Sequence, residues 1–431
     1  MKWLQESLQS FVSFCYDSSW CCGRCLGRGG LNTDRGAEMT DRGRFMSARW
    51  QGCVPKAAVV ACLAALPLAG CATVPPVAPV PKLVAAGNGD SAAPDIAAGN
   101  RYVSFASTST DLVAVPDPNG AGADYFLADT VAGTIQRITT SATGASGTGG
   151  TSLPFTTSIS EDGRYVAFAS AAPDLSAEVD TDENVDIYRW DRVTGTTIRV
   201  SDGVNNALWQ FLDISDSGDV IGWAEATPTK QIMTAKVSTA TLHATPIANQ
   251  THSVTGVEVA GDGSSVLYST SNQIFQGGEI VSIHPDTFAT QTVLGGADGF
   301  YRAISGVSTD GTVILYRKSQ PSTQTSLAIR RDLASGTETT LGTDSRGAAL
   351  EGYARFSLHI VQTSTASSQI GRIVWTDAQG GTSIVAEYLA NPTVSGSNFS
   401  DFMGLASDGT VAFATKLPAG TNRSAVYTFH P

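Results

Sequence analysis

Short apolar runs separated by polar turns recur along the chain from about residue 90 onward. The clearest unit starts at Ile159, turns at Asp162-Gly163 and continues into the apolar run 165–170. A loop, a second apolar run at 186–191, a Thr194-Gly195 turn and the β-branched run 196–200 complete it. Apolar runs of this length between tight turns are typical of antiparallel strands. Each unit therefore predicts four short strands.

The turn glycine recurs, and an apolar strand follows each copy: Gly99, Gly163, Gly218, Gly263, Gly311 and Gly409. The intervals are roughly 45 to 65 residues, except the last, which is about twice as long. We therefore expect a degenerate turn near Ser357–Ile360. The third strand of the unit recurs in the same place, at Arg372–Asp377, where the turn itself has eroded.

Four-stranded units at this period predict an all-β fold, a single β-propeller of four-stranded blades. Seven blades are favoured, with a six-bladed ring as the alternative. The last unit ends just after its third strand, and the run Lys82–Ala86 is available to supply the fourth from the N-terminal side. Such closure of the ring would remove exposed strand edges.

The segment Ser160–Ser170, with the Asp-Ile-Tyr and Thr-Gly positions after it, resembles the WD40-like PD40 repeat of TolB-type propellers. Residues 159–201 carry the best match, 94–139 nearly match, and the resemblance extends over about 82–431. It implies a periplasmic or cell-surface propeller that binds proteins or peptides. TolB proteins have six blades and a separate N-terminal α/β domain, for which residues 72–94 leave no room, so their Tol–Pal role is not implied.

An export signal precedes the repeats. Arg49 and Lys56 form a positively charged segment, Ala57–Ala69 is apolar, and small residues lead to Cys71. This order is that of a secretory signal peptide, and the apolar stretch is too short to cross a hydrocarbon core of about 30 Å. The tetrad Leu-Ala-Gly-Cys that ends at Cys71 resembles a bacterial lipobox, which implies cleavage before Cys71 and its lipidation. Ala72 at the next position implies, by the same resemblance, an outer-membrane lipoprotein facing the periplasm or the cell surface.

These features divide the chain into four segments. Residues 1–45 are interpreted as lying upstream of the true translation start, at Met46 or Met39, and residues 46–70 as the signal peptide. Residues 71–81 are the lipidated cysteine and a proline-rich linker, and residues 82–431 are the propeller. Prolines at this density favour polyproline II, at about 3.1 Å per residue, which would hold the propeller roughly 30 Å from the bilayer.

Charge and cysteine content limit the kinds of binding partner that we expect. The formal net charge is −12, and residues 1–70 carry more basic than acidic side chains, so the propeller is more acidic than the whole chain. An acidic body repels phosphate backbones, so no nucleic acid is expected, and basic peptides or metal cations match better. All seven cysteines lie at or before Cys71, so the propeller needs no disulfide framework. We expect a monomer attached to the membrane through its lipid and bound to an unidentified envelope protein or peptide.

Oxygen-bearing side chains alternate along one loop of the second unit: Asp180, Asp182, Asn184 and Asp186. This spacing begins like a calcium loop, but Val185 replaces the expected glycine and no glutamate closes the pattern. A thinner echo lies in the first unit, at Asp117, Asn119 and Asp124. Turn formation by Asp and Asn side chains is the favoured interpretation, and calcium is the one candidate cofactor.

No catalytic residue is assigned, because the sequence contains no His-Glu-x-x-His motif, no Gly-x-Ser-x-Gly motif and no phosphate-binding glycine loop. Trp209 and Phe211, in a loop before one of the turns, are the candidates for ligand binding at the central mouth. The leading hypothesis is therefore a non-enzymatic binding module or scaffold. The alternatives are a hydrolase or lyase with its site in the central channel, and a calcium-stabilised structural scaffold.

Overall fold

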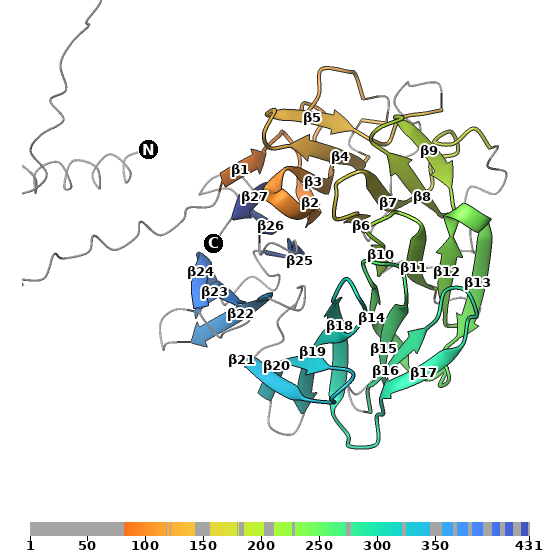
Figure 1. The fold of residues 1–431 in the computed structure, drawn as a ribbon. Coiled ribbons are helices and arrows are strands. Elements are labelled where there is room, and N and C mark those ends of the chain that lie inside the picture. Colours follow the sequence, from red (N-terminus) through yellow and green to blue (C-terminus); the bar gives the residue numbers. More distant parts are fainter. Residues whose placement is uncertain are drawn as a thin grey trace, which may run out of the picture. The chain divides into compact units, whose positions relative to one another are not determined.

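Strands and tight turns make up nearly all of the described chain (Figure 1). The computed structural model describes residues 82–429, with gaps at 118, 121, 143–155, 179, 181–184, 202–210, 226–228, 273–276, 321–324, 345–355, 365–368, 378–381, 391–398, 406–409 and 417–423. These residues all belong to the unit Pro75–Pro431. Within them, six antiparallel sheets have four strands and one has three.

Blades are numbered in chain order, and strands within a blade from the inside outward. The first blade holds β2 (Ser91–Ile96), β3 (Tyr102–Ser107), β4 (Asp124–Asp129) and β5 (Thr134–Arg137), and the second holds β6 (Thr157–Ile159), β7 (Tyr165–Ser170), β8 (Asp186–Asp191) and β9 (Thr196–Arg199). The third holds β10 (Leu212–Ile214), β11 (Val220–Glu225), β12 (Gln231–Lys236) and β13 (Thr241–Pro246), and the fourth holds β14 (Ser253–Val259), β15 (Val266–Ser271), β16 (Glu279–Ile283) and β17 (Thr290–Leu294). Two short 3₁₀ turns are η1 (Ala98–Asn100) and η2 (Val237–Thr239).

The remaining blades complete the series. The fifth holds β18 (Tyr301–Val307), β19 (Val313–Gln320), β20 (Thr325–Asp332) and β21 (Glu338–Asp344). The sixth holds β22 (Phe356–Ser364), β23 (Gln369–Asp377) and β24 (Thr382–Ala390). The seventh holds β25 (Phe399–Leu405), β26 (Val411–Lys416), β27 (Ser424–Phe429) and β1 (Lys82–Ala85).

The ring closes as the sequence predicts. Inner strands β2, β6, β10, β14 and β18 contact one another in succession, and β25 of the seventh blade contacts β2 of the first (Figure 1). Strand β1 pairs antiparallel with β27, with Lys82 opposite Thr428 and Leu83 opposite Tyr427. The first strand of the chain therefore supplies the fourth strand of the last blade. The fold is a closed β-propeller.

The expected degenerate unit is the sixth blade. The predicted position of the eroded turn, Ser357–Ile360, is wrong, because these residues lie inside strand β22, which begins at Phe356. Strand β23 contains the predicted third strand. Three strands of this blade are described, and residues 345–355 before β22 lie outside the described residues. The repeat assignment made from the third strand alone is confirmed here.

Antiparallel order places the turns on two faces. The turns after the first and third strands of each blade lie on one face, which we call the turn face, and the loops after the second and fourth strands lie on the other, the loop face. The predicted turn glycines adopt left-handed φ values between 67° and 74° wherever they are described: Gly99, Gly163, Gly218, Gly263 and Gly311. Gly409 lies outside the described residues.

Two of these glycines also seat an aromatic ring of the preceding blade. A Cβ on Gly163 would stand 2.3 Å from the Tyr102 ring, and one on Gly218 would stand 2.2 Å from the Tyr165 ring. Both distances are far below van der Waals contact, so no larger residue fits. The glycine therefore shapes the turn and also joins two blades.

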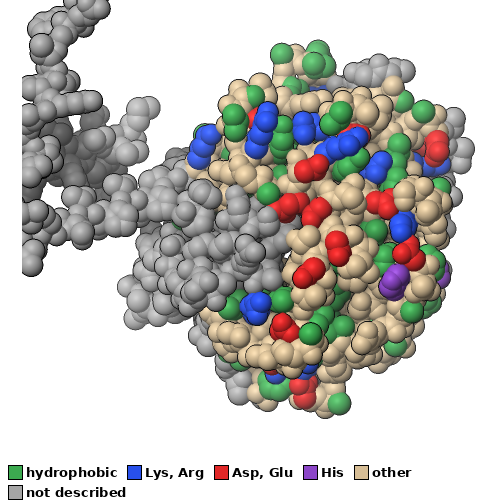
Figure 2. Space-filling view, in the orientation of Figure 1, with side chains coloured by type: hydrophobic (Ala, Val, Ile, Leu, Met, Phe, Trp, Pro, Cys, Tyr) green, Lys and Arg blue, Asp and Glu red, His purple; other side chains and the backbone are tan. Residues whose placement is uncertain are grey.

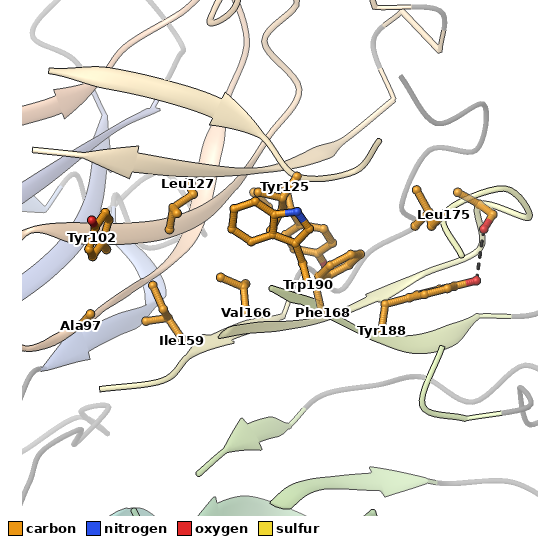
Figure 3. Packing of buried hydrophobic residues seen from close by; sticks show 13 residues of the cluster. Ala97, Tyr102, Tyr125, Leu127, Ile159, Val166, Phe168, Leu175, Tyr188 and Trp190 are labelled. Atoms are coloured by element: carbon orange, nitrogen blue, oxygen red, sulfur yellow. Dashed lines mark hydrogen bonds between the residues drawn. The ribbon is translucent and has the colours of Figure 1, made fainter. Parts of the chain in front are cut away.

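Apolar side chains fill the space between blades. Between the first and second, Tyr125 packs on Phe168 at 5.1 Å between ring centroids, and Phe168 stacks on Tyr188 at 5.8 Å (Figure 3). Trp190 is almost fully buried in the same cluster, as a core interpretation of the tryptophans predicts. The Tyr188 hydroxyl donates to the carbonyl oxygen of Ala172 at 3.2 Å, which satisfies its polar end.

Candidate functional site

Polar side chains occupy one equivalent position on four adjacent inner strands. Each lies one residue before the end of its strand, and together they are Asp95, Ser158, Asp213 and Glu258. Inner strands line the axis of a propeller, so this position brings carboxylates from separate blades toward one axis.

Hydrogen bonds use these carboxylates to join blades. Asp213 accepts from Ser158 Oγ at 2.7 Å and from the Val259 amide at 2.6 Å, so it links the second, third and fourth blades. Asp95 accepts from the Ile159 amide at 2.9 Å and links the first blade to the second. Burial raises the pKa of both carboxyls, and the charge of Asp213 raises that of Asp95 further. We interpret both carboxylates as structural links between blades, because backbone amides donate hydrogen bonds to their oxygens.

A second group of acids lies in the turns beside these strands. Burial raises the pKa of Asp216 to about 6, and the negative charges of its neighbours raise it further; these are Glu161, Asp213, Asp162 and Asp262. We call Glu161, Asp162, Asp216 and Asp262 the acidic centre. Figure 2 shows acidic side chains gathered near the middle of the visible face, with Lys and Arg nearer its rim.

Backbone hydrogen bonds between blades hold the acidic centre in place. The Asp216 amide donates to the carbonyl of Gly261 at 2.8 Å, and the Asp262 amide donates to that of Thr309 at 2.7 Å. The Glu161 carbonyl accepts from the Ala98 amide at 2.9 Å. These bonds fix the backbone that carries the carboxylates, so the like charges stay on neighbouring turns of the turn face.

The carboxylates of the acidic centre come from three successive blades. Across the described residues, no group of three or more His, Cys, Asp or Glu side chains is arranged to hold a metal. A lysine or arginine side chain can donate hydrogen bonds to more than one carboxylate.

The predicted calcium loop is described in part. Asp186 is fully buried, and the guanidinium of Arg199 lies 3.4 Å from it and 3.6 Å from Asp180. The hydroxyl of Ser201 donates to Asp186 at 3.1 Å. The positive charge beside these two carboxylates therefore belongs to Arg199, at the end of strand β9. Asp182 and Asn184 lie outside the described residues, so calcium at this loop stays a prediction.

The echo in the first blade repeats this arrangement. Arg137 lies 3.5 Å from Asp124 and 3.8 Å from Asp117, and all three side chains are buried. Burial raises the pKa of Asp124 to about 6, although the hydrogen bond from Thr139 lowers it. In both blades an arginine of the fourth strand holds the loop before the third strand.

The other predicted site residues lie outside the acidic centre. Phe211 is half-buried and packs against an apolar cluster of the third and fourth blades that includes Val220 and Val257. Trp209 and Cys71 lie outside the described residues, so their roles stay predictions. No helix in the described part of the chain is long and apolar enough to cross a membrane.

Sequence reasoning missed the acidic centre, although a signal exists. Aligned on the turn glycines, Glu161 and Asp216 both stand two residues before their glycine. Asp213 and Glu258 likewise both stand five residues before theirs. Carboxylates are common in the loops of an acidic chain, so only this shared register separates them from ordinary turn residues.

Comparisons with known proteins support the fold alone. No protein-family profile matches the chain, and no curated protein matches it in sequence. Among solved structures, an oligogalacturonate lyase from Vibrio parahaemolyticus is similar at a TM-score of 0.55 and 10% identity, over 81% of this chain and 92% of that one. TolB from Acinetobacter baumannii has a TM-score of 0.41 and 14% identity over 65% of this chain and 66% of that one, just under two thirds of its length. Hydrazine synthase from Kuenenia stuttgartiensis has a TM-score of 0.43 and 12% identity over 61% and 76%.

Proposed function

We propose that this protein is a lipid-anchored binding module of the cell envelope whose turn face binds a lysine- or arginine-bearing segment of a protein or peptide. The observation that carries the proposal is the acidic centre, where Asp216 faces several like charges on a backbone fixed by hydrogen bonds. A cationic side chain would relieve that repulsion. The net charge of −12 adds long-range attraction for such a partner.

The site's charge argues against two other roles. Oligogalacturonate is a polyanion, and an acidic centre would repel it, so the substrate named for the similar lyase does not transfer. For a hydrolase or lyase acting at the axis, the inner strands offer Asp95, Asp213 and Glu258, and the first two already accept backbone hydrogen bonds. The proposal therefore takes binding rather than catalysis as the function.

Attachment to the envelope rests on the sequence. The lipobox-like tetrad proposes Cys71 as the lipidated residue, and residues 72–81 as its tether to the propeller. An outer-membrane lipoprotein with this tether would meet its partner in the periplasm or at the cell surface.

Titration with a basic peptide tests the binding role. We expect a fluorescent peptide of alternating Lys and Ala to bind, and an alternating Glu and Ala peptide not to bind. Asp216→Asn should weaken binding about fivefold at pH 8, which corresponds to about 1 kcal/mol. Binding should weaken as pH falls through about 6, because Asp216 then takes up a proton.

The matched control is Glu178→Gln, which removes one charge from a side chain 72% exposed on the loop face. It should change affinity less than twofold. Equal losses in the two variants, or equal binding of the acidic and basic peptides, would contradict the proposal, because only bulk charge would then matter.

A further inference from the structure

The chain enters the propeller on the turn face. Strand β1 runs antiparallel to β27 in the place of a fourth strand, and fourth strands begin at the turn face. Lys82, its first residue, donates from Nζ to the carbonyl of Thr130 at 2.9 Å, in the turn between β4 and β5. Lys82, the first described residue, therefore lies beside this turn of the first blade.

Two exposed valines stand at equivalent turn tips of the first and second blades. Val131 is 75% exposed in the first blade, and Val193 is 65% exposed in the second. The carboxylate of Asp129 holds the Val131 amide at 3.0 Å, and that of Asp191 holds the Val193 amide at 2.8 Å. The fold thus presents two apolar side chains to solvent on rigid turns.

Basic side chains lie near these two turns, and ion pairs and ring contacts hold them in position. Arg101 pairs with Asp129 at 2.9 Å, and Arg164 pairs with Asp191 at 3.0 Å. Arg192 stacks on the ring of Tyr102 at 4.1 Å. The same ring carries Arg101 at 4.8 Å, so contacts across both blades connect the set. We call Lys82, Arg101, Arg164, Arg192, Val131 and Val193 the rim patch.

The rim patch carries a positive excess on an acidic chain. Arg192 donates from Nε to the carbonyl of Gly163 at 2.8 Å, and Lys82 donates to that of Thr130. A carbonyl accepts these hydrogen bonds without cancelling the charge. Figure 2 shows a row of Lys and Arg side chains along one part of the rim, apart from the acidic middle.

We propose that the rim patch docks on anionic phospholipid headgroups of the bilayer that holds the anchor, an inference that rests on the proposed lipidation of Cys71. Residues 72–81 span at most about 35 Å at roughly 3.5 Å per residue, so a linker that lies along the membrane surface, in place of standing upright on it, lets the rim patch reach the bilayer. Cations attract anionic headgroups within about a Debye length, and exposed valines insert at the headgroup boundary.

The charge pattern sets the orientation of the docked ring. The same anionic surface that attracts the rim patch repels the acidic centre. Contact through the first and second blades tilts the turn face and leaves its acidic centre open to a basic partner. The Arg164 amide donates to Asp162 at 2.9 Å, so docking and partner binding use adjoining parts of one face.

Site-specific fluorescence on the lipidated mature chain tests the docking. The propeller contains no cysteine, so Val131→Cys, Val193→Cys and Val115→Cys each place one reactive thiol. Val115 is 59% exposed in the loop between β3 and β4, on the loop face, and serves as the matched control. In vesicles of phosphatidylglycerol and phosphatidylethanolamine with a headgroup quencher, we expect at least about threefold stronger quenching at 131 and 193 than at 115. Arg192→Gln should reduce that difference, and equal quenching at the three positions would overturn the proposal.

A second readout separates docking from anchoring. The intact mass of the chain expressed from Met46, beside Cys71→Ser, reports whether acyl chains are attached. The unlipidated Cys71→Ser chain should still float with phosphatidylglycerol vesicles at low salt more than with phosphatidylcholine vesicles. Val193→Asp should reduce this flotation and Val115→Asp should not. Absence of acyl chains would end the anchor proposal and, with it, docking on the anchoring bilayer. Flotation indifferent to lipid charge or to Val193→Asp would end the docking proposal even where acyl chains are present.

Discussion

At the scale of single residues, the recurring glycine has two roles that are both needed. Gly163 has a φ of 68°, which favours glycine, and the Tyr102 ring occupies the place where its Cβ would stand. Gly195, in the next turn of the same blade, has a φ of 69° but open space around it. Comparing substitutions at the two glycines therefore distinguishes the cost of left-handed backbone strain from the cost of disturbed packing between blades.

We expect Gly163→Ala to lower the free energy of unfolding by about 2 to 4 kcal/mol, since left-handed strain costs about 1 kcal/mol and overpacking adds 1 to 3. Gly195→Ala should lower it by about 1 kcal/mol, from strain alone. Urea unfolding of both variants measures the difference. Equal losses would mean that the Tyr102 ring moves aside without cost.

At the scale of elements, closure depends on a four-residue strand. Ala85, at the end of β1, is 2% exposed and packs in a cluster with Ile96, Val103 and Val426. Leu83, two residues earlier, is 50% exposed. The strand thus has one residue that packs into the junction of the first and last blades and another that faces solvent.

Ala85→Asp should therefore lower the free energy of unfolding by about 3 kcal/mol or more, because it buries an unpaired carboxyl. Leu83→Asp, in the same strand, should cost less than about 1 kcal/mol. Chemical denaturation gives the stabilities, and proteolysis near residue 82 reports whether β1 detaches. A mild effect of Ala85→Asp together with rapid cleavage would show that the ring persists without its closing strand.

At the scale of the whole molecule, the acids near the axis make stability depend on pH. The folded pKa of Asp216 lies at about 6, above its ordinary value of 3.8. Between these values the folded state holds a proton that the unfolded state has released, so stability falls as pH rises through this window. The buried carboxyls of Asp95 and Asp213 act in the same direction.

Thermal or urea unfolding should therefore give greater stability at pH 5 than at pH 8. One proton contributes a slope of at most about 1.4 kcal/mol per pH unit. Asp216→Asn should raise stability at pH 8 and flatten the slope, while Glu178→Gln, at an exposed position, should do neither. If Asp216→Asn left the pH dependence of stability unchanged, other titrating groups would be responsible for it.

Much of the architecture could be predicted from the sequence because its determinants are local. Turn glycines need particular φ values, strands need short apolar runs, and the missing fourth strand at one end matches a spare strand at the other. The sixth blade was found through its third strand, which lies within β23. These features lie within a few residues of each other and recur at a readable period.

The site could not be predicted in the same way, because its members meet only across blades. Asp95 bonds an amide 64 residues away, and Asp213 bonds one 46 residues away. The spacing of Asp180 and Asp186 favoured turn formation, with calcium binding as the alternative, and only the tertiary structure brings the guanidinium of Arg199 to both carboxylates. By itself the sequence determined most strands and turns and the closing strand, and it favoured seven blades over six, since these features depend on local geometry. The closed ring alone decided which charges converge at the axis and which face the rim, because convergence depends on register between distant strands.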